Sequence, residues 1–327
     1  MIKLILLFWL IGSLNGANIS LPKTVLQASG GVVDLMLDGE KLYSATNASC
    51  VDIFDMQTKT RTHKIEIGKI TDFMGNTIDS KVYSVDVSGN KVLILSQGEK
   101  GFRRVHIHML PSRGTDTAGA EGKTKLIIPE TEKLSIAKAK FLDENTILLA
   151  LLSNDIISYD IKKKKQNWKI QVSQSKFSNF ALNENRSEVV VADESGILKL
   201  YNTSNGSLIK TFSGQNLDNV FQVAYKNSII ATAGQDRRVV IYNAKTGAAY
   251  YKTAQFLIYS VGLSPSANIV GYSSDENNNV TLFDTNTKSE IGRFGANEMT
   301  LSAILFINEN EFIVSSDDSK INLYKIK

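Results

Sequence analysis

The feature of the sequence that most restricts its fold is a short pattern that occurs seven times. Each copy alternates apolar residues, continues with an aromatic or apolar residue, and ends in a small polar or charged one. The copies cover residues 51–55, 104–108, 155–160, 197–202, 239–243, 280–284 and 321–325. Their last residues are 53, 52, 42, 41, 41 and 41 positions apart. A four-stranded blade of a β-propeller uses about 40–45 residues, so the pattern predicts an all-β propeller of seven blades, two of them with insertions.

The fifth unit shows the expected order inside a blade. Residues 219–224 and 228–233 predict the first two strands, and residues 239–242 and 249–253 predict the third and fourth. In the hairpin between the third and fourth strands, Gly206 and Gly247 occupy equivalent positions four residues beyond the end of the pattern. Glycine reaches positive φ without steric cost, so we expect left-handed backbone there. The residues at the same offset in three other units are Lys59, Lys164 and Lys288.

The two ends of the chain predict how the propeller closes. The seventh unit stops after its third strand, at Lys327. Residues 24–29 precede the first unit and have the composition of a strand. We therefore expect them to complete the last blade as its fourth strand, which removes an exposed sheet edge.

The N-terminus resembles a secretory signal peptide. Lys3 is followed by an apolar stretch from Leu4 to Leu14, and small residues follow at Gly16 and Ala17. This stretch fits the apolar region of a signal peptide and is too short to span a bilayer. We expect a signal peptide over residues 1–17, cleavage, and a single exported domain over residues 18–327 without a membrane span. An uncleaved anchor is the alternative.

Composition and charge limit the class of partner. The net charge is +4, with 37 basic and 33 acidic residues, which gives no strong electrostatic footprint for nucleic acid. The densest basic run, residues 162–165, is interpreted as a solvated hairpin tip, with a phosphate or lipid patch as the alternative. Cys50 is the only cysteine, so no internal disulfide forms. We expect its thiol to be buried and unreactive.

The histidines and the glycine-rich loop do not predict a catalytic or metal site. His106 and His108 alternate along one strand and share a face, where two imidazoles could begin a zinc or copper site. No third ligand is placed by a motif, so we interpret them as exposed strand residues. The segment from Pro111 to Thr124 ends like a phosphate-binding loop, but the first glycine and the following helix are missing. We expect a hairpin extension there.

A set of five aspartates allows two interpretations. They fall at the turns between the second and third strands of their units, and they are Asp155, Asp193, Asp236, Asp275 and Asp317. Aspartate side chains often cap backbone N–H groups in such turns. We therefore interpret them as turn residues. A central cation or ligand site is the alternative.

Residues 230–236 and 313–318 resemble the second strand and following turn of WD40 repeats, and Tyr-Asn, Phe-Asp and Tyr-Asp stand where that family has Trp-Asp. The resemblance covers residues 24–327 but is degenerate, because no Trp-Asp or Gly-His pair is present. The hydrogen-bond tetrad of the WD40 family is therefore not transferred. Residues 243–247 resemble a hairpin of quinoprotein-type propellers, which usually have eight blades.

An exported, degenerate seven-unit propeller of this length is similar to the accessory proteins of bacterial periplasmic nitrate reductases, the NapL type. That resemblance implies a periplasmic, non-catalytic protein that supports the enzyme system through protein contacts. No functional residues transfer with it. The alternatives are a quinoprotein-like outer-membrane assembly scaffold and a propeller enzyme of the lactonase or quinoprotein kind.

Two insertions are the best candidates for a binding surface. The first, residues 69–82, contains Ile70, Phe73 and Met74, and the second is the segment from Pro111 to Thr124. Arg103 and Arg104 add basic charge to the same blade as the second insertion. Apolar residues of the first insertion either form a docking patch or fold back onto the propeller. We expect a monomer that binds a protein partner, with no catalytic, cofactor or metal residues.

Overall fold

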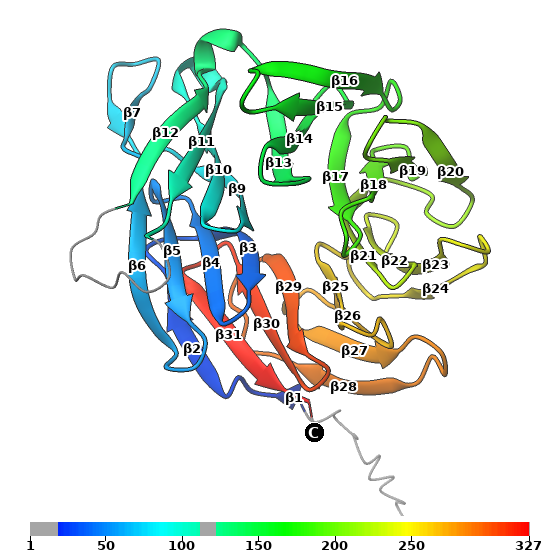
Figure 1. Ribbon diagram of the computed structural model, residues 1–327. Coiled ribbons are helices and arrows are strands. Elements are labelled where there is room, and N and C mark those ends of the chain that lie inside the picture. Colours follow the sequence, from blue (N-terminus) through cyan, green and yellow to red (C-terminus); the bar gives the residue numbers. More distant parts are fainter. Residues whose placement is uncertain (1–18, 112–121, 327) are drawn as a thin grey trace, which may run out of the picture.

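The computed structural model describes residues 19–111 and 122–326, and it is a seven-bladed β-propeller. Seven small sheets, antiparallel except for one added strand in the sixth, stand side by side around a central axis (Figure 1). The expected signal peptide over residues 1–17 and most of the second insertion lie outside the described residues. The all-β class and the number of blades predicted from the sequence are both confirmed.

Five blades each consist of four consecutive strands. The first contains β3 (Val32–Asp38), β4 (Lys41–Thr46), β5 (Cys50–Asp55) and β6 (Thr60–Glu66). The second contains β9 (Val82–Ser88), β10 (Lys91–Gln97), β11 (Arg103–Met109) and β12 (Lys123–Ile128). The third contains β13 (Ile136–Phe141), β14 (Thr146–Leu151), β15 (Asp155–Asp160) and β16 (Lys165–Gln171). The fourth contains β17 (Phe177–Leu182), β18 (Glu188–Asp193), β19 (Leu198–Asn202) and β20 (Leu208–Phe212). The fifth contains β21 (Val220–Lys226), β22 (Ile229–Gly234), β23 (Arg238–Asn243) and β24 (Ala249–Thr253).

The last two blades include strands from the N-terminal segment. The sixth contains β25 (Val261–Leu263), β26 (Ile269–Ser273), β27 (Val280–Asp284), β28 (Glu290–Phe294) and β1 (Ile19–Ser20). The seventh contains β29 (Leu301–Asn308), β30 (Glu311–Ser316), β31 (Lys320–Lys325) and β2 (Thr24–Gln27). A small separate hairpin, β7 (Ile70–Thr71) and β8 (Thr77–Ile78), joins the first two blades. Two single-turn 3₁₀ helices cover Glu99–Gly101 and Glu130–Glu132.

The propeller closes as the sequence predicts. Strand β2 pairs antiparallel with β31, with Thr24 opposite Leu323 and Gln27 opposite Lys320. It supplies the fourth strand that the seventh unit lacks. Strand β1 was not predicted, and it adds a fifth strand to the sixth blade by pairing parallel with β28. The segment before the first blade therefore adds strands to two blades.

The repeating pattern has a local physical cause at its last residue. In the first, fifth and sixth units this residue is Asp55, Asn243 or Asp284, and its side-chain oxygen accepts two backbone N–H groups of the next turn. The turn then needs one residue with positive φ. All five residues named for that offset have it, with φ of 60°, 53°, 72°, 83° and 64° at Lys59, Lys164, Gly206, Gly247 and Lys288. The predicted left-handed position is confirmed, and lysine adopts it as well as glycine.

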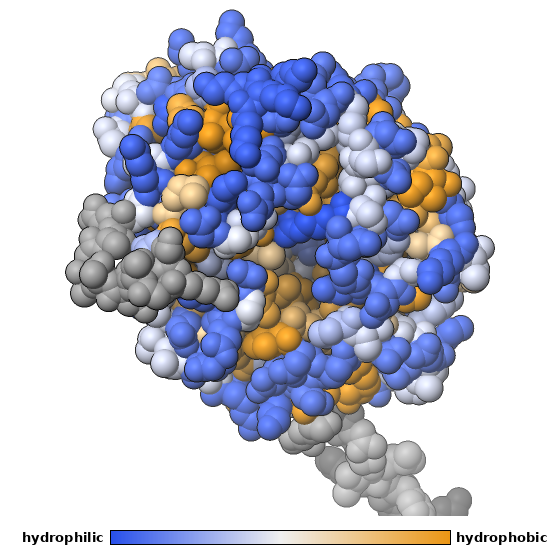
Figure 2. Space-filling model, in the orientation of Figure 1, coloured by the Kyte–Doolittle hydropathy of each residue, from blue (hydrophilic) through white to orange (hydrophobic). Residues whose placement is uncertain are grey.

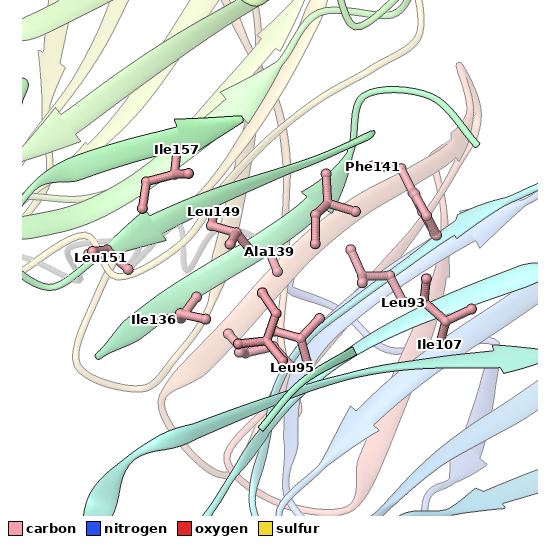
Figure 3. Packing of buried hydrophobic residues seen from close by; sticks show 12 residues of the cluster. Leu93, Leu95, Ile107, Ile136, Ala139, Phe141, Leu149, Leu151 and Ile157 are labelled. Atoms are coloured by element: carbon pink, nitrogen blue, oxygen red, sulfur yellow. The ribbon is translucent and has the colours of Figure 1, made fainter. Parts of the chain in front are cut away.

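The hydrophobic core lies between neighbouring blades. One cluster joins the second and third blades through side chains such as Leu93, Leu95 and Phe141, which are buried completely (Figure 3). Each sheet is thus apolar on both sides, and six further clusters of buried residues are found in the described chain. Cys50 is buried as expected, and burial raises the pKa of its thiol. Lys162 to Lys165 are exposed around the hairpin between β15 and β16, as predicted.

The ring of blades has two faces. We call upper the face that carries the turns between second and third strands and the connections from one blade to the next. The lower face carries the other two kinds of turn. The first insertion belongs to the upper face, and the β11–β12 hairpin, which contains the second insertion, belongs to the lower face.

Candidate functional site

The first insertion forms an ordered hairpin that presents two large apolar side chains to solvent. Strand β7 pairs with β8, with Ile70 opposite Ile78. At the tip, the Phe73 side chain is 94% exposed and Met74 is 73% exposed. Ile70, in contrast, is 4% exposed and packs inward. The interpretation that the insertion folds back onto the propeller therefore holds for its base and not for its tip, and the docking patch stays a prediction.

Hydrogen bonds fix the tip of this hairpin. The Asp72 carboxylate accepts the N–H groups of Met74 and Asn76, each at 2.8 Å. These bonds hold the pKa of Asp72 below its usual range, with the bond from Asn76 as the largest cause. Gly75 supplies the positive φ of 87° that the tight turn requires. Phe73 and Met74 are therefore displayed on a preorganised turn.

The base of the hairpin is tied to the first blade. The Ser49 hydroxyl donates to Asp79 at 2.9 Å, and the same hydroxyl accepts the N–H of Ser80 at 2.8 Å. The hydroxyl of Ser80 donates in turn to the carbonyl of Gln97 in the second blade at 2.7 Å. The hairpin is thus anchored between two blades and has little freedom to fold away.

Exposed apolar side chains are concentrated on the upper face. Within the described residues, seven exposed large hydrophobic residues lie in loops of this face, and they are Phe73, Met74, Leu152, Ile197, Leu217, Phe256 and Met299. The turns of the lower face that the structure describes carry no side chain of this class. The remaining ones lie on strands or in the linker between β1 and β2. The upper face is therefore the more apolar of the two.

Arg103 and Arg104, the basic part of the predicted surface, are engaged within the second blade. The Arg104 guanidinium forms an ion pair with Glu130, which neutralises its charge. The Arg103 guanidinium lies over the ring of Tyr83, 4.1 Å from the ring centre. Both begin β11, at the same end of the blade as the Phe73 hairpin. They contribute less free positive charge than the sequence suggested.

The prediction that His106 and His108 are exposed is wrong. Both are 8% exposed, because β11 is an inner strand of its sheet and the neighbouring blade covers its face. His106 lies 3.1 Å from the Ser96 hydroxyl, and His108 lies 2.8 Å from that of Thr124. Burial lowers the pKa of His106 to about 4 and also lowers that of His108.

The aspartates at the upper turns act as turn residues in the three clearest cases. Asp193, Asp236 and Asp275 each accept a backbone N–H two residues further along, at 2.9–3.1 Å. In the seventh blade Asp318 caps the turn, not Asp317. Across residues 19–111 and 122–326, no group of three or more His, Cys, Asp or Glu side chains is arranged to hold a metal ion.

A second candidate site, which the sequence did not single out, is the central channel. It encloses a cavity of about 400 Å³ lined by the innermost strands of the blades. Figure 2 shows this hollow at the centre of one face, with hydrophilic surface on one side and hydrophobic surface on the other. The charged side chains that line it are Asp34, Lys138, Lys140 and Lys226. Three lysines thus face one carboxylate.

Two of these lysines come from β13 and have different partners. Lys140 forms an ion pair with Asp34, at 2.8 Å between Nζ and Oδ2. Lys138 donates to the Asn179 side-chain oxygen and to the Phe180 carbonyl, each at 2.9 Å. The pKa of Lys138 is lowered to about 8, mainly by burial and to a smaller extent by the nearby charge of Lys140, while Asp34 and Asp86 act in the opposite direction. A sequence pattern could have indicated these lysines, because residues 137–140 read Ala-Lys-Ala-Lys in the first strand of a unit.

Comparison of the chain with models of known protein families and with curated proteins finds no match to either. Among the described residues, no helix has the length and hydrophobicity needed to cross a membrane. The fold and the two sites above therefore carry the functional argument.

Proposed function

We propose that the protein is a non-catalytic scaffold that binds a protein partner through its upper face, with the Phe73–Met74 hairpin as the main contact. The observation that supports it is the exposure of two large apolar side chains on a turn fixed by hydrogen bonds. Aromatic residues and methionine are enriched in protein interfaces. A rigid turn loses little conformational entropy on binding.

The identity of the proposed partner rests on the sequence resemblance and not on the geometry of the upper face. The similarity to NapL-type accessory proteins and the expected signal peptide favour a periplasmic redox enzyme, the periplasmic nitrate reductase. In this proposal the protein supports the maturation or activity of that enzyme as an exported monomer. The five apolar residues on other loops of the upper face would extend the contact beyond the hairpin.

The test is direct binding of the purified mature protein to the periplasmic nitrate reductase of the same host, measured by calorimetry. Wild-type protein is expected to bind, and the variant Phe73→Ser with Met74→Ser is expected to lose most of its affinity. The matched control is Leu208→Ser with Ile209→Ser, which removes two exposed apolar side chains (54% and 45%) from the outer strand of the fourth blade. This control should bind like wild type.

Each outcome has a distinct meaning. If wild-type protein does not bind the reductase, the proposed partner is wrong. If both double variants bind as wild type does, the hairpin is not the contact. A photo-crosslinking residue at position 73, compared with one at position 209, then identifies the protein that touches the hairpin in the cell.

A further inference from the structure

The central channel has a cationic side and an apolar side. Lys138 and Lys140 project from β13 in the third blade. Across the ring, the channel is lined by Ala303 and Leu305 of the seventh blade, and Val33 of the first blade lines it next to them; all three are partly buried. Since the third and seventh blades lie across the channel from each other (Figure 1), a molecule inside would meet both surfaces.

The charge on the cationic side is not balanced within the channel. Asp34 is the single carboxylate among the lining residues, and Lys140 already forms an ion pair with it. Lys138 has no carboxylate partner among the described residues: its ammonium donates to oxygens of Asn179 and Phe180 and lies over the Phe180 ring, 5.1 Å from the ring centre. An ammonium has three donors, so one N–H of Lys138 is left after these two bonds, counted within the described chain. Burying a cation without a counter-ion costs free energy, and an anion bound in the channel would reduce that cost.

The size and lining of the cavity restrict that anion. A volume of about 400 Å³ lies within the range of small-molecule pockets. The lining contains no arginine, the side chain best suited to bidentate phosphate binding. Lys138 and Lys226 line the cavity without an ion pair among the described residues, and Lys138 is the one whose ammonium is held in place by two acceptors of the neighbouring blade. One carboxylate would match the charge of Lys138, and the opposite wall suits an apolar group.

We propose that the central channel is a binding site for a small organic monocarboxylate, with its carboxylate on Lys138 and its hydrocarbon part against Ala303 and Leu305. This site is separate from the upper-face hairpin and does not depend on the proposed protein partner. In the ligand-free protein the pKa of Lys138 is about 8, so this side chain is cationic at neutral pH and becomes neutral in mildly alkaline solution.

The charged groups around Lys138 give the sign of the pH effect. Lys140 of the same strand disfavours its protonation, whereas Asp34 of β3 and Asp86 of β9 favour it. A carboxylate ligand is ionised throughout the neutral and alkaline range. Affinity is therefore highest below about pH 8 and falls as Lys138 loses its proton.

The probe is octanoate, titrated into the mature protein by calorimetry, with 1-octanol and inorganic phosphate as comparisons. Octanoate should bind more tightly than either, because only it combines the charge and the hydrocarbon chain. Its affinity should fall at least about ten-fold between about pH 7 and pH 9.5, as the proton on Lys138 is lost. Lys138→Met should weaken binding at neutral pH by about ten-fold or more.

The matched control is Lys163→Met, which removes an exposed lysine from the β15–β16 hairpin and should leave both affinity and pH dependence unchanged. Circular dichroism shows whether Lys138→Met is folded, and the pH series on wild-type protein tests the site if it is not. The proposal is overturned if octanoate does not bind at millimolar concentration, if 1-octanol or phosphate binds equally well, if Lys138→Met binds as wild type does, or if affinity is flat across the pH range.

Discussion

Lys140 of the third blade reaches the carboxylate of Asp34 in the first blade, with 2.8 Å between Nζ and Oδ2. The Lys140 ammonium also donates to the carbonyl of Val85 in the second blade, at 2.8 Å. Asp34 in turn accepts the N–H of Val85 at 3.1 Å. One ion pair thus fastens the innermost strands of three successive blades.

Replacing Asp34 by Ala should destabilise the propeller. The change leaves the Lys140 ammonium, whose side chain is 14% exposed, with the Val85 carbonyl alone. Loss of a charged hydrogen bond in such a setting costs about 1.5–3 kcal/mol. Urea denaturation followed by tryptophan fluorescence measures the free energy of unfolding.

The control for this change is Glu298→Ala, which removes the partner of Lys320 in an ion pair whose side chains are 64% and 42% exposed. Exposed pairs contribute about 0–1 kcal/mol. Equal losses in the two variants would show that the Asp34 pair has no special role between the blades.

The sequence predicted the strand order and closure because both depend on local patterns. Alternation and turn residues recur with a fixed period, and the seventh unit visibly lacks one strand. Strand β1 could not be predicted, because a two-residue strand has no pattern of its own and forms only where the edge of β28 is available. The exposure of His106 was misjudged for a similar reason, since neighbouring blades cover both sides of a sheet.

Closure should depend on the buried side of β2. Leu26 is 3% exposed and packs with Leu35 and Phe54 of the first blade, whereas its neighbour Val25 is 48% exposed. Leu26→Ala leaves a cavity in this cluster and should cost about 2–5 kcal/mol. Val25→Ala, in the same strand, should cost less than about 1 kcal/mol. Thermal unfolding of both variants is the measurement, and similar losses would argue against closure through the buried face.

Acidification should destabilise the protein through His106. Burial lowers the pKa of this imidazole to about 4 in the folded state, against about 6.5 when unfolded. Between these two pKa values the unfolded chain binds a proton at His106 and the folded protein does not. The free energy of unfolding is therefore unaffected by this group above about pH 6.5 and decreases as the pH falls toward 4. The decline attributable to this one group is about 3 kcal/mol.

The measurement is the free energy of unfolding of wild type and His106→Gln at several pH values between 7 and 4.5. Glutamine does not titrate, so the variant should lose less stability on acidification than wild type. Carboxylates titrate in both proteins and cancel in the difference. Parallel pH profiles would contradict the assignment to His106.

The candidate sites could be predicted only in part from the sequence. An insertion with Phe73 and Met74 stands out from the repeat length, but its sequence does not say that Ile70 turns inward while the other two turn outward. The sequence could not predict that Lys138 lacks a carboxylate partner. The nearby carboxylate belongs to Asp34, about a hundred residues earlier, and it pairs with Lys140 and not with Lys138. The charge balance inside the channel depends on which side chains of different blades come together when the ring closes.

A buried asparagine connects the strands of the fifth blade, and its loss should be costly. The Oδ1 atom of Asn216 accepts hydrogen bonds from the hydroxyls of Thr232 at 3.1 Å and Tyr242 at 3.2 Å. In the seventh blade Asn297 accepts a similar bond from Tyr324 at 3.1 Å, but this hydroxyl also reaches the carbonyl of Gly295.

Asn216→Ala removes the acceptor that both buried hydroxyls share, and should cost about 1–3 kcal/mol. In Asn297→Ala, Tyr324 keeps the Gly295 carbonyl as an acceptor at 2.6 Å, but the bonds of Asn297 with the Asn278 carbonyl and the Asn322 amide are lost. We therefore expect a loss of similar size in this variant. Urea denaturation gives both free energies of unfolding, and a loss below about 0.5 kcal/mol for Asn216→Ala would contradict the role of the shared acceptor.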